Sequence, residues 1–112
     1  MSSLYTRITR LPRPYEQDRG EEAVQHCASL PHEVHPLILG AAGCSPYLGH
    51  LISKEAEWLP EACDNPEAAM QAVISVVADL GPDQLATGLR VAKRRIALIT
   101  GLADLAGVWP LE

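Results

Sequence analysis

Apolar residues recur at three- and four-residue spacing along most of this chain, which is the period of an amphipathic helix. The pattern is clearest near the carboxyl end, where it predicts a long helix from about Asp83 to Ala106. Two apolar stripes follow this helix. The first stripe contains Leu85, Leu89, Ala92, Ile96, Ile99, Ala103 and Ala106, and the second contains Val91, Leu98, Leu102 and Leu105.

A helix that is apolar on two sides needs a packing partner on each side. The short helices predicted upstream are enough to cover one stripe. We therefore expect the second stripe, with Leu98 and Leu105, to stay exposed in this chain and to favour self-association.

Proline and capping residues predict where the middle helices begin. Ser45-Pro46 and Asn65-Pro66 each combine a side chain that caps free amides with a proline suited to the first helical turn. Between these two helices, a short turn from Glu55 to Leu59 carries Trp58, and Pro60 is expected to close it. The first helix would present Tyr47, Leu48, Leu51 and Ile52 on one side, and the second would present Met70, Val73, Ile74, Val77 and Leu80 before Gly81-Pro82 stops it.

The first third of the chain is less regular. Residues 1–16 lack apolar periodicity and contain two prolines, so we expect an extended arm there. Residues 17–30 predict a helix that Pro31 ends, residues 35–40 a short helix or a buried turn, and residues 40–43 a loop. No alternating strand pattern occurs. The predicted class is all-α, with short helices joined by Pro/Gly turns and packed on one long C-terminal helix, without a sheet.

Composition narrows the range of functions. The 112 residues suffice for one modest core, and the net charge of −5 provides no general attraction to nucleic acid or to an anionic membrane. Eight of the nine basic residues form two groups, four within the first 19 residues and four between Arg90 and Arg95. No apolar run is long enough to span a bilayer. The three cysteines are odd in number and irregularly spaced, so we expect free thiols and a cytoplasmic location.

Two segments resemble a known family. Residues 45–62, SPYLGHLISKEAEWLPEA, and residues 89–112, LRVAKRRIALITGLADLAGVWPLE, are similar to the N-terminal region of the glutamine synthetase adenylyltransferase/adenylyl-removing enzymes. The two segments occur in the order and at the separation expected for that family. The matching positions are Ser45, Tyr47, Leu48, Glu57, Trp58 and Leu59 in the first segment, and Leu89, Arg90, Lys93, Arg94, Arg95, Ile96, Asp104 and Leu105 in the second.

The resemblance implies an enzyme that attaches AMP to glutamine synthetase and removes it, in the regulation of nitrogen metabolism, with a PII-type signal protein as a further partner. Its two nucleotidyltransferase-like domains would use Mg²⁺ with ATP or ADP, and each needs an Asp-x-Asp pair to hold the metal. This chain contains no Asp-x-Asp, and Gly43 is followed by Cys44 where the family's Gly-Ser turn needs a serine. We therefore expect a chain without catalytic residues or a cofactor of its own.

The same resemblance places residues 17–112 before the first catalytic domain, as a helical segment that supports the adenylyl-removing half. Its direct partners would be the downstream domains of the same protein. The last residues, Trp109-Pro110-Leu111-Glu112, are typical of the beginning of another helix, so we expect this chain to be part of a longer protein. The alternative is a free-standing helical module that binds a partner protein through its final helix.

The basic cluster of Arg90, Lys93, Arg94 and Arg95 allows two interpretations. Its side chains could contact phosphate groups, or their aliphatic stems could cover the edge of the core while their charges pair with carboxylates. The spread of these side chains around the helix favours the structural role, with Glu55, Glu57 or Glu61 as partners. Trp58 and Tyr47 are expected to anchor the core between the short helices.

Histidine and cysteine residues are the remaining candidates for chemistry. His26, Cys27, His32 and His35 are close in sequence, but their spacing fits no common structural zinc site. Cys44 immediately precedes a helix, where the helix dipole favours a reactive thiol, yet no histidine is placed to act with it. We predict neither a metal site nor a nucleophile.

Overall fold

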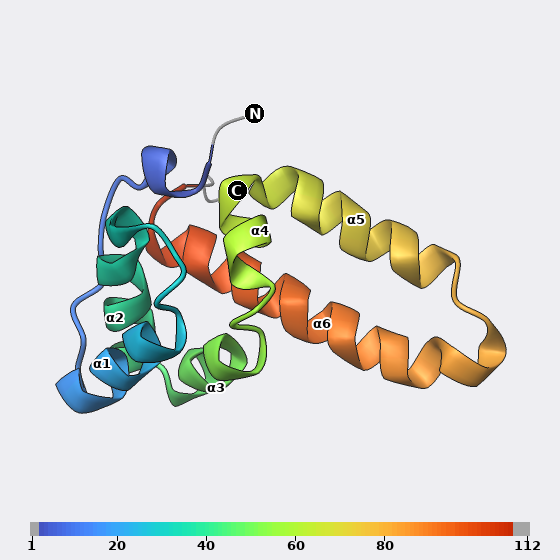
Figure 1. The fold of residues 1–112 in the computed structure, drawn as a ribbon, viewed down its shortest axis with the longest axis horizontal. Helices are drawn as coiled ribbons and strands as arrows, with labels where there is room; N and C mark the ends of the chain where they lie inside the picture. The colour runs from blue at the N-terminus through green and yellow to red at the C-terminus, as the bar shows by residue number, and fades with distance from the viewer. Residues whose placement is uncertain (1–2, 109–112) are drawn as a thin grey trace.

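The computed structural model describes residues 3–108, and in that part of the chain all regular structure is helical, as the apolar pattern predicts (Figure 1). None of the described helices is long and apolar enough to cross a membrane. The helix start predicted at Trp109-Pro110 lies outside the described residues. The elements are two 3₁₀ turns, Tyr5–Arg7 and His32–Val34, and the helices α1 (Gln17–His26), α2 (His35–Cys44), α3 (Pro46–Lys54), α4 (Leu59–Asp64), α5 (Pro66–Ala78) and α6 (Pro82–Leu105).

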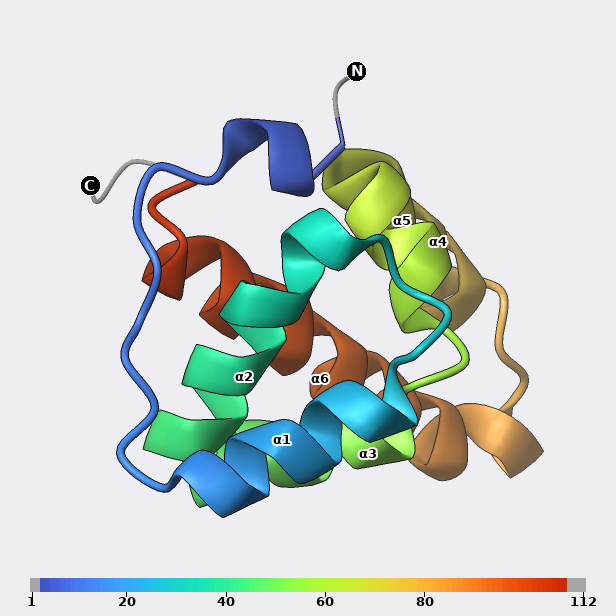
Figure 2. The same cartoon turned by 60° about the vertical axis from the view of Figure 1, so that its left-hand side comes forward.

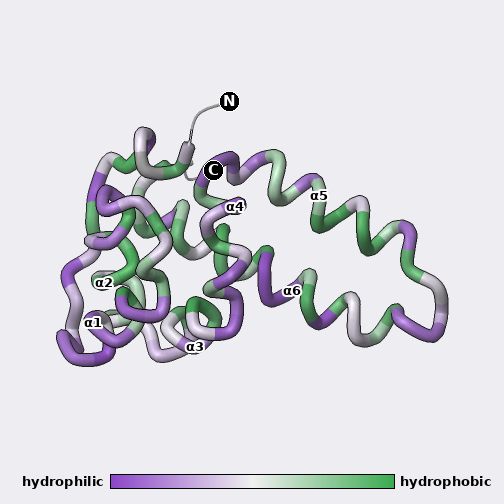
Figure 3. The backbone as a smooth tube through the Cα atoms, in the orientation of Figure 1, coloured by the Kyte–Doolittle hydropathy of each residue, from purple (hydrophilic) through white to green (hydrophobic). Residues whose placement is uncertain are grey.

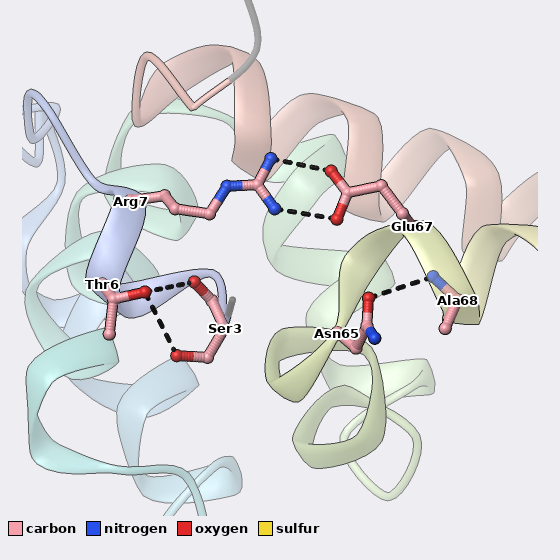
Figure 4. Close-up of polar contacts among 6 residues, drawn as sticks. All are labelled: Ser3, Thr6, Arg7, Asn65, Glu67 and Ala68. Carbon is pink, nitrogen blue, oxygen red and sulfur yellow. Dashed lines mark hydrogen bonds and ion pairs between the residues drawn. The ribbon is translucent and has the colours of Figure 1, made fainter. Parts of the chain in front are cut away.

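Prolines stand in the first turn of every described helix from α2 to α6. They fit there because an N–H at this position has no acceptor within the helix. The Ser45 side chain accepts a hydrogen bond from the Leu48 N–H at 3.1 Å. The Asn65 side chain accepts one from the Ala68 N–H at 3.2 Å, as Figure 4 shows. Both capped helix starts predicted from the sequence are therefore confirmed.

Three local predictions are wrong. Pro60 opens α4 and does not close the turn around Trp58, since proline is better suited to a first helical turn than to a stop. Helix α1 ends at His26, and the residues before Pro31 form turns. Residues 40–43 continue α2 and do not form a loop, and their small size allows the N-terminal arm to pack closely against this helix. A Cβ added at Gly40 would lie only 2.1 Å from the carbonyl oxygen of Pro12.

Helix α2 lies at the centre of the core, with α1, α3 and the second half of α6 packed around it (Figure 2). Helices α2 and α3 pack against this half of α6, where Leu98 and Leu102 are fully buried and Leu105 is partly buried. Helix α3 approaches so closely that a Cβ added at Gly101 would lie 2.9 Å from the side chain of Leu48. The prediction that this second stripe stays exposed is therefore wrong.

The N-terminal arm packs across the last turn of α6 (Figure 2). The backbone N–H groups of Thr9 and Arg10 donate to the carbonyl of Ala106 at 2.8 and 3.1 Å, and the side chain of Leu4 is fully buried. Apart from the 3₁₀ turn at Tyr5–Arg7, residues 3–16 contain no helix. The arm thus joins the beginning of the described chain to its end.

Helix α5 and the first half of α6 form a hairpin that projects from the other helices (Figures 1 and 3). At 1.5 Å per residue, α6 is about 36 Å long, whereas α2 is about 15 Å and α3 about 14 Å long. The short helices can therefore cover only the second half of α6. Apolar side chains stay exposed on the hairpin, namely Ile74, Val76, Leu85 and Leu89.

Candidate functional site

A buried carboxylate lies where the turn after α3 meets α6. The backbone N–H of Glu55 donates to the carbonyl of Leu51 at the end of α3, and Glu55 is only 3% exposed. The Nε of Arg95 donates to one oxygen of this carboxylate at 2.7 Å, and the Nε of Arg94 donates to the other. Successive residues of a helix point about 100° apart, so the two arginines reach the carboxylate from two directions.

Trp58 completes this cluster. The guanidinium carbon of Arg95 lies 5.1 Å from the centroid of the Trp58 ring, in a cation–π arrangement. The ring itself is buried in the core, as expected for an anchor between the short helices. Of the three carboxylates predicted as partners for the arginines, Glu55 binds them, whereas Glu57 and Glu61 are exposed.

The geometry of this cluster indicates a structural connection between the turn and α6. Both carboxylate oxygens of Glu55 accept hydrogen bonds from cations, so the group is placed as a fixed counter-ion and not as a general base. A buried charge is tolerated in a protein when it is paired and hydrogen-bonded in this way. A polar cleft of about 330 Å³ lies beside the cluster, with Lys54 and Glu57 in its lining.

The structure separates the other predicted residues from this cluster. Tyr47 is 61% exposed, so its prediction as a core anchor is wrong; α3 buries Leu48 and the residues on its side, and the position before Leu48 points about 100° away. Arg90 is exposed, and the hydrogen bond described for its side chain runs to the carbonyl of Ala86 in its own helix. Lys93 lies on the hairpin. The basic run therefore divides into a partly buried pair that binds Glu55 and an exposed pair.

One ion pair is not predicted from the sequence. Arg7 and Glu67 form two hydrogen bonds of 2.7 Å between guanidinium and carboxylate, which fasten the arm to the start of α5 (Figure 4). The hydrogen bonds to Glu67 raise the pKa of Arg7 above its usual value. The two residues are 60 positions apart. No local pattern in the sequence signals such a pair.

The cysteines and histidines lie in different environments. Cys27 and Cys63 are buried free thiols, and burial raises the pKa of Cys27 to about 11 and that of Cys63 to about 12. His32 and His35 meet edge to face, with their ring centroids 5.0 Å apart. Within residues 3–108, no group of three or more His, Cys, Asp or Glu residues could hold a metal ion.

The hairpin carries an apolar groove of about 710 Å³, which we call the hairpin groove. The apolar pattern of α6 predicts that the opposite face of this helix is exposed. Such a pattern indicates one packing partner for each stripe but not how far along α6 the short helices reach. The groove is lined by Ile74 and Val77 of α5 and by Leu89, Ala92, Lys93, Ile96, Ala97 and Thr100 of α6.

Comparisons with known proteins give one similarity. No protein-family model matches the chain, and no solved structure matches it. It is 33% identical over 81 residues, 67% of its length, to a protein of Bradyrhizobium sp. (strain BTAi1) named bifunctional glutamine synthetase adenylyltransferase/adenylyl-removing enzyme. The match spans only 8% of that relative. The similarity therefore concerns a small region of a much longer enzyme and agrees with the family that the sequence resembles.

Proposed function

We propose that this chain is a non-catalytic helical region of an enzyme of the glutamine synthetase adenylyltransferase/adenylyl-removing family, where it supports the adenylyl-removing half. The observation that carries the proposal is the similarity over 81 residues to the Bradyrhizobium enzyme. The activity of the whole enzyme would belong to other parts of the protein, because this chain has no Asp-x-Asp pair to hold Mg²⁺.

The fold supports this proposal by bringing the two similar segments together. Glu55 and Trp58 belong to the segment at residues 45–62, and their partners Arg94 and Arg95 belong to the segment at residues 89–112. Segments that are similar to one family and that pack on each other form a coherent structural unit. Such a unit would contact the catalytic domains of its own protein, while glutamine synthetase, the PII-type signal protein, ATP or ADP and Mg²⁺ would bind elsewhere in a cytoplasmic enzyme.

A chimeric enzyme tests this role. The region of the Bradyrhizobium enzyme that aligns with this chain is replaced by this chain. Adenylyl removal is then measured with Mg²⁺ as the formation of ADP from phosphate and the AMP group of adenylylated glutamine synthetase. We expect the chimera to retain adenylyl removal, and Glu55→Ala in the chimera to reduce it more than the exposed control Glu57→Ala. A folded chimera that attaches AMP but does not remove it would contradict the proposal. The isolated chain should give no turnover above a buffer blank.

A second candidate function is a free-standing interaction module. The observation that favours it is the hairpin groove, whose apolar lining is exposed on one end of the molecule. The reading frame after Glu112 distinguishes the two candidates. A following Gly-Ser turn with an Asp-x-Asp pair is expected for the enzyme region, and a stop codon for the module.

A further inference from the structure

The hairpin has an apolar surface that no other described element covers. Leu89, at its centre, is 46% exposed, and Ile74 faces the same groove from α5. Two amphipathic helices packed only on each other leave part of their apolar faces in water. A further pair of helices would complete a four-helix arrangement.

The charges on α6 and the loop before it are arranged in two groups of opposite sign. Asp79 and Asp83 are exposed at the tip of the hairpin, and Arg90 and Lys93 are exposed further along α6. Among the described residues, none of these four has an ion-pair partner. Asp83 and Lys93 lie at equal separations on either side of Gly88, and about 15 Å apart along the helix axis.

We propose that the hairpin groove binds the hairpin of a second copy of this chain, antiparallel and related by a two-fold axis near Gly88 and Leu89. In this arrangement Asp83 of each copy lies opposite Lys93 of the other, so two pairs of opposite charge form across the interface. Leu85 and Leu89 of each copy enter the groove of the other, where Ala92 and Ala97 leave space. The same surface on both copies forms the interface, as two-fold symmetry requires. This inference does not depend on the proposed function.

Charge reversal tests the pairing. One variant carries Asp79→Lys with Asp83→Lys, and the other carries Arg90→Glu with Lys93→Glu. In either variant alone, charges of the same sign face each other across the two-fold axis, so we expect the dissociation constant from sedimentation at low salt to rise at least tenfold. In an equimolar mixture, both sets of opposite charges are restored between unlike chains. We therefore expect a heterodimer about as stable as the unmodified dimer.

An apolar substitution tests the groove. Leu89→Glu should leave the chain monomeric, whereas Leu11→Glu, on the arm and similarly exposed at 49%, should not change the dissociation constant. Circular dichroism verifies that each variant is folded. An unmodified chain that is monomeric at the highest concentration would overturn the proposal. So would a Leu89→Glu variant that still dimerises, or reversed variants that do not associate when mixed.

Discussion

The buried carboxylate of Glu55 accepts a hydrogen bond from the Nε of Arg95 at 2.7 Å, across 40 positions of sequence. Arg94, the neighbouring residue, pairs with the second oxygen of the same group. One turn residue therefore fixes two successive residues of α6, and the Trp58 ring covers one of them. This relationship aligns the short helices with the long one. It also gives Arg94 and Arg95, two of the four residues of the basic cluster, a structural role.

Glu55→Ala should lower the free energy of unfolding by about 2–4 kcal/mol. Removing one partner of a fully buried ion pair costs about 3–5 kcal/mol, and the expected loss here is smaller because the two arginine side chains are about one-third exposed and can be hydrated. Urea denaturation measures the change. Glu57→Ala, on the exposed side of the same turn, is the matched control and should stay within about 0.5 kcal/mol of the unmodified chain. Equal effects of the two substitutions would contradict the assignment.

Trp58→Ala should cost about 3–5 kcal/mol, the range for removing a large buried aromatic side chain. The ring fills the core between the short helices and α6 and also lies under the guanidinium of Arg95. Tyr47→Ala is the comparison, since Tyr47 is exposed on α3 and should change stability by no more than about 0.5 kcal/mol. A loss below about 1 kcal/mol for Trp58→Ala would place the ring at the surface.

The features predicted correctly from the sequence depend on local chemistry. Ser45 and Asn65 each cap a helix that begins with a proline, and the apolar periodicity of α6 is visible along its whole length. The errors concern properties that depend on distant residues. Gly40 is typical of a loop when only its neighbours are considered, yet it lies inside α2, where the absence of a Cβ leaves room for the carbonyl of Pro12. Likewise, the lengths of α2 and α3 determine which part of α6 is exposed. The apolar pattern of α6 itself does not indicate these lengths.

The two buried thiols make stability depend on pH above the neutral range. An unfolded thiol ionises near its usual pKa of 9.0, whereas burial raises the pKa to about 11 for Cys27 and to about 12 for Cys63. At a pH between 9.0 and these raised pKa values, the thiols of the unfolded chain lose protons that the thiols of the folded chain keep. The contribution of the thiols is fully present below pH 9.0 and is lost as the pH rises through about 11 and 12.

The midpoint of urea denaturation should therefore be lower at pH 10.5 than at pH 8. Lysines and tyrosines also titrate in this range. The variant with Cys27→Ala and Cys63→Ala separates the effect of the thiols from that of the lysines and tyrosines. Its stability should depend less on pH than that of the unmodified chain. An unchanged dependence would show that the thiols do not contribute.

Thiol labelling should distinguish the three cysteines in the folded protein. Cys44 is exposed, and the other two are buried. We expect an aromatic disulfide reagent at pH 8 to modify Cys44 rapidly, and to modify Cys27 and Cys63 only after denaturation, because a buried thiol with a raised pKa is neither accessible nor ionised. Mass spectrometry of the labelled peptides identifies the sites. Rapid labelling of all three cysteines under native conditions would contradict this assignment of buried thiols.

The same substitution at two helical glycines should have opposite effects. Gly40→Ala in α2 places a methyl group 2.1 Å from the carbonyl oxygen of Pro12, so the arm has to move away and stability should fall by about 1–3 kcal/mol. Gly49→Ala in α3 meets its nearest neighbour, the Cβ of Ala42, at 3.5 Å, which is an ordinary contact. It should stabilise the chain by about 0.5–1 kcal/mol, because alanine loses less conformational entropy than glycine in a helix. Thermal denaturation of both variants, with proteolysis of the arm as a second measurement, distinguishes these effects. If Gly40→Ala stabilises the chain as Gly49→Ala does, the arm does not pack on α2 in solution.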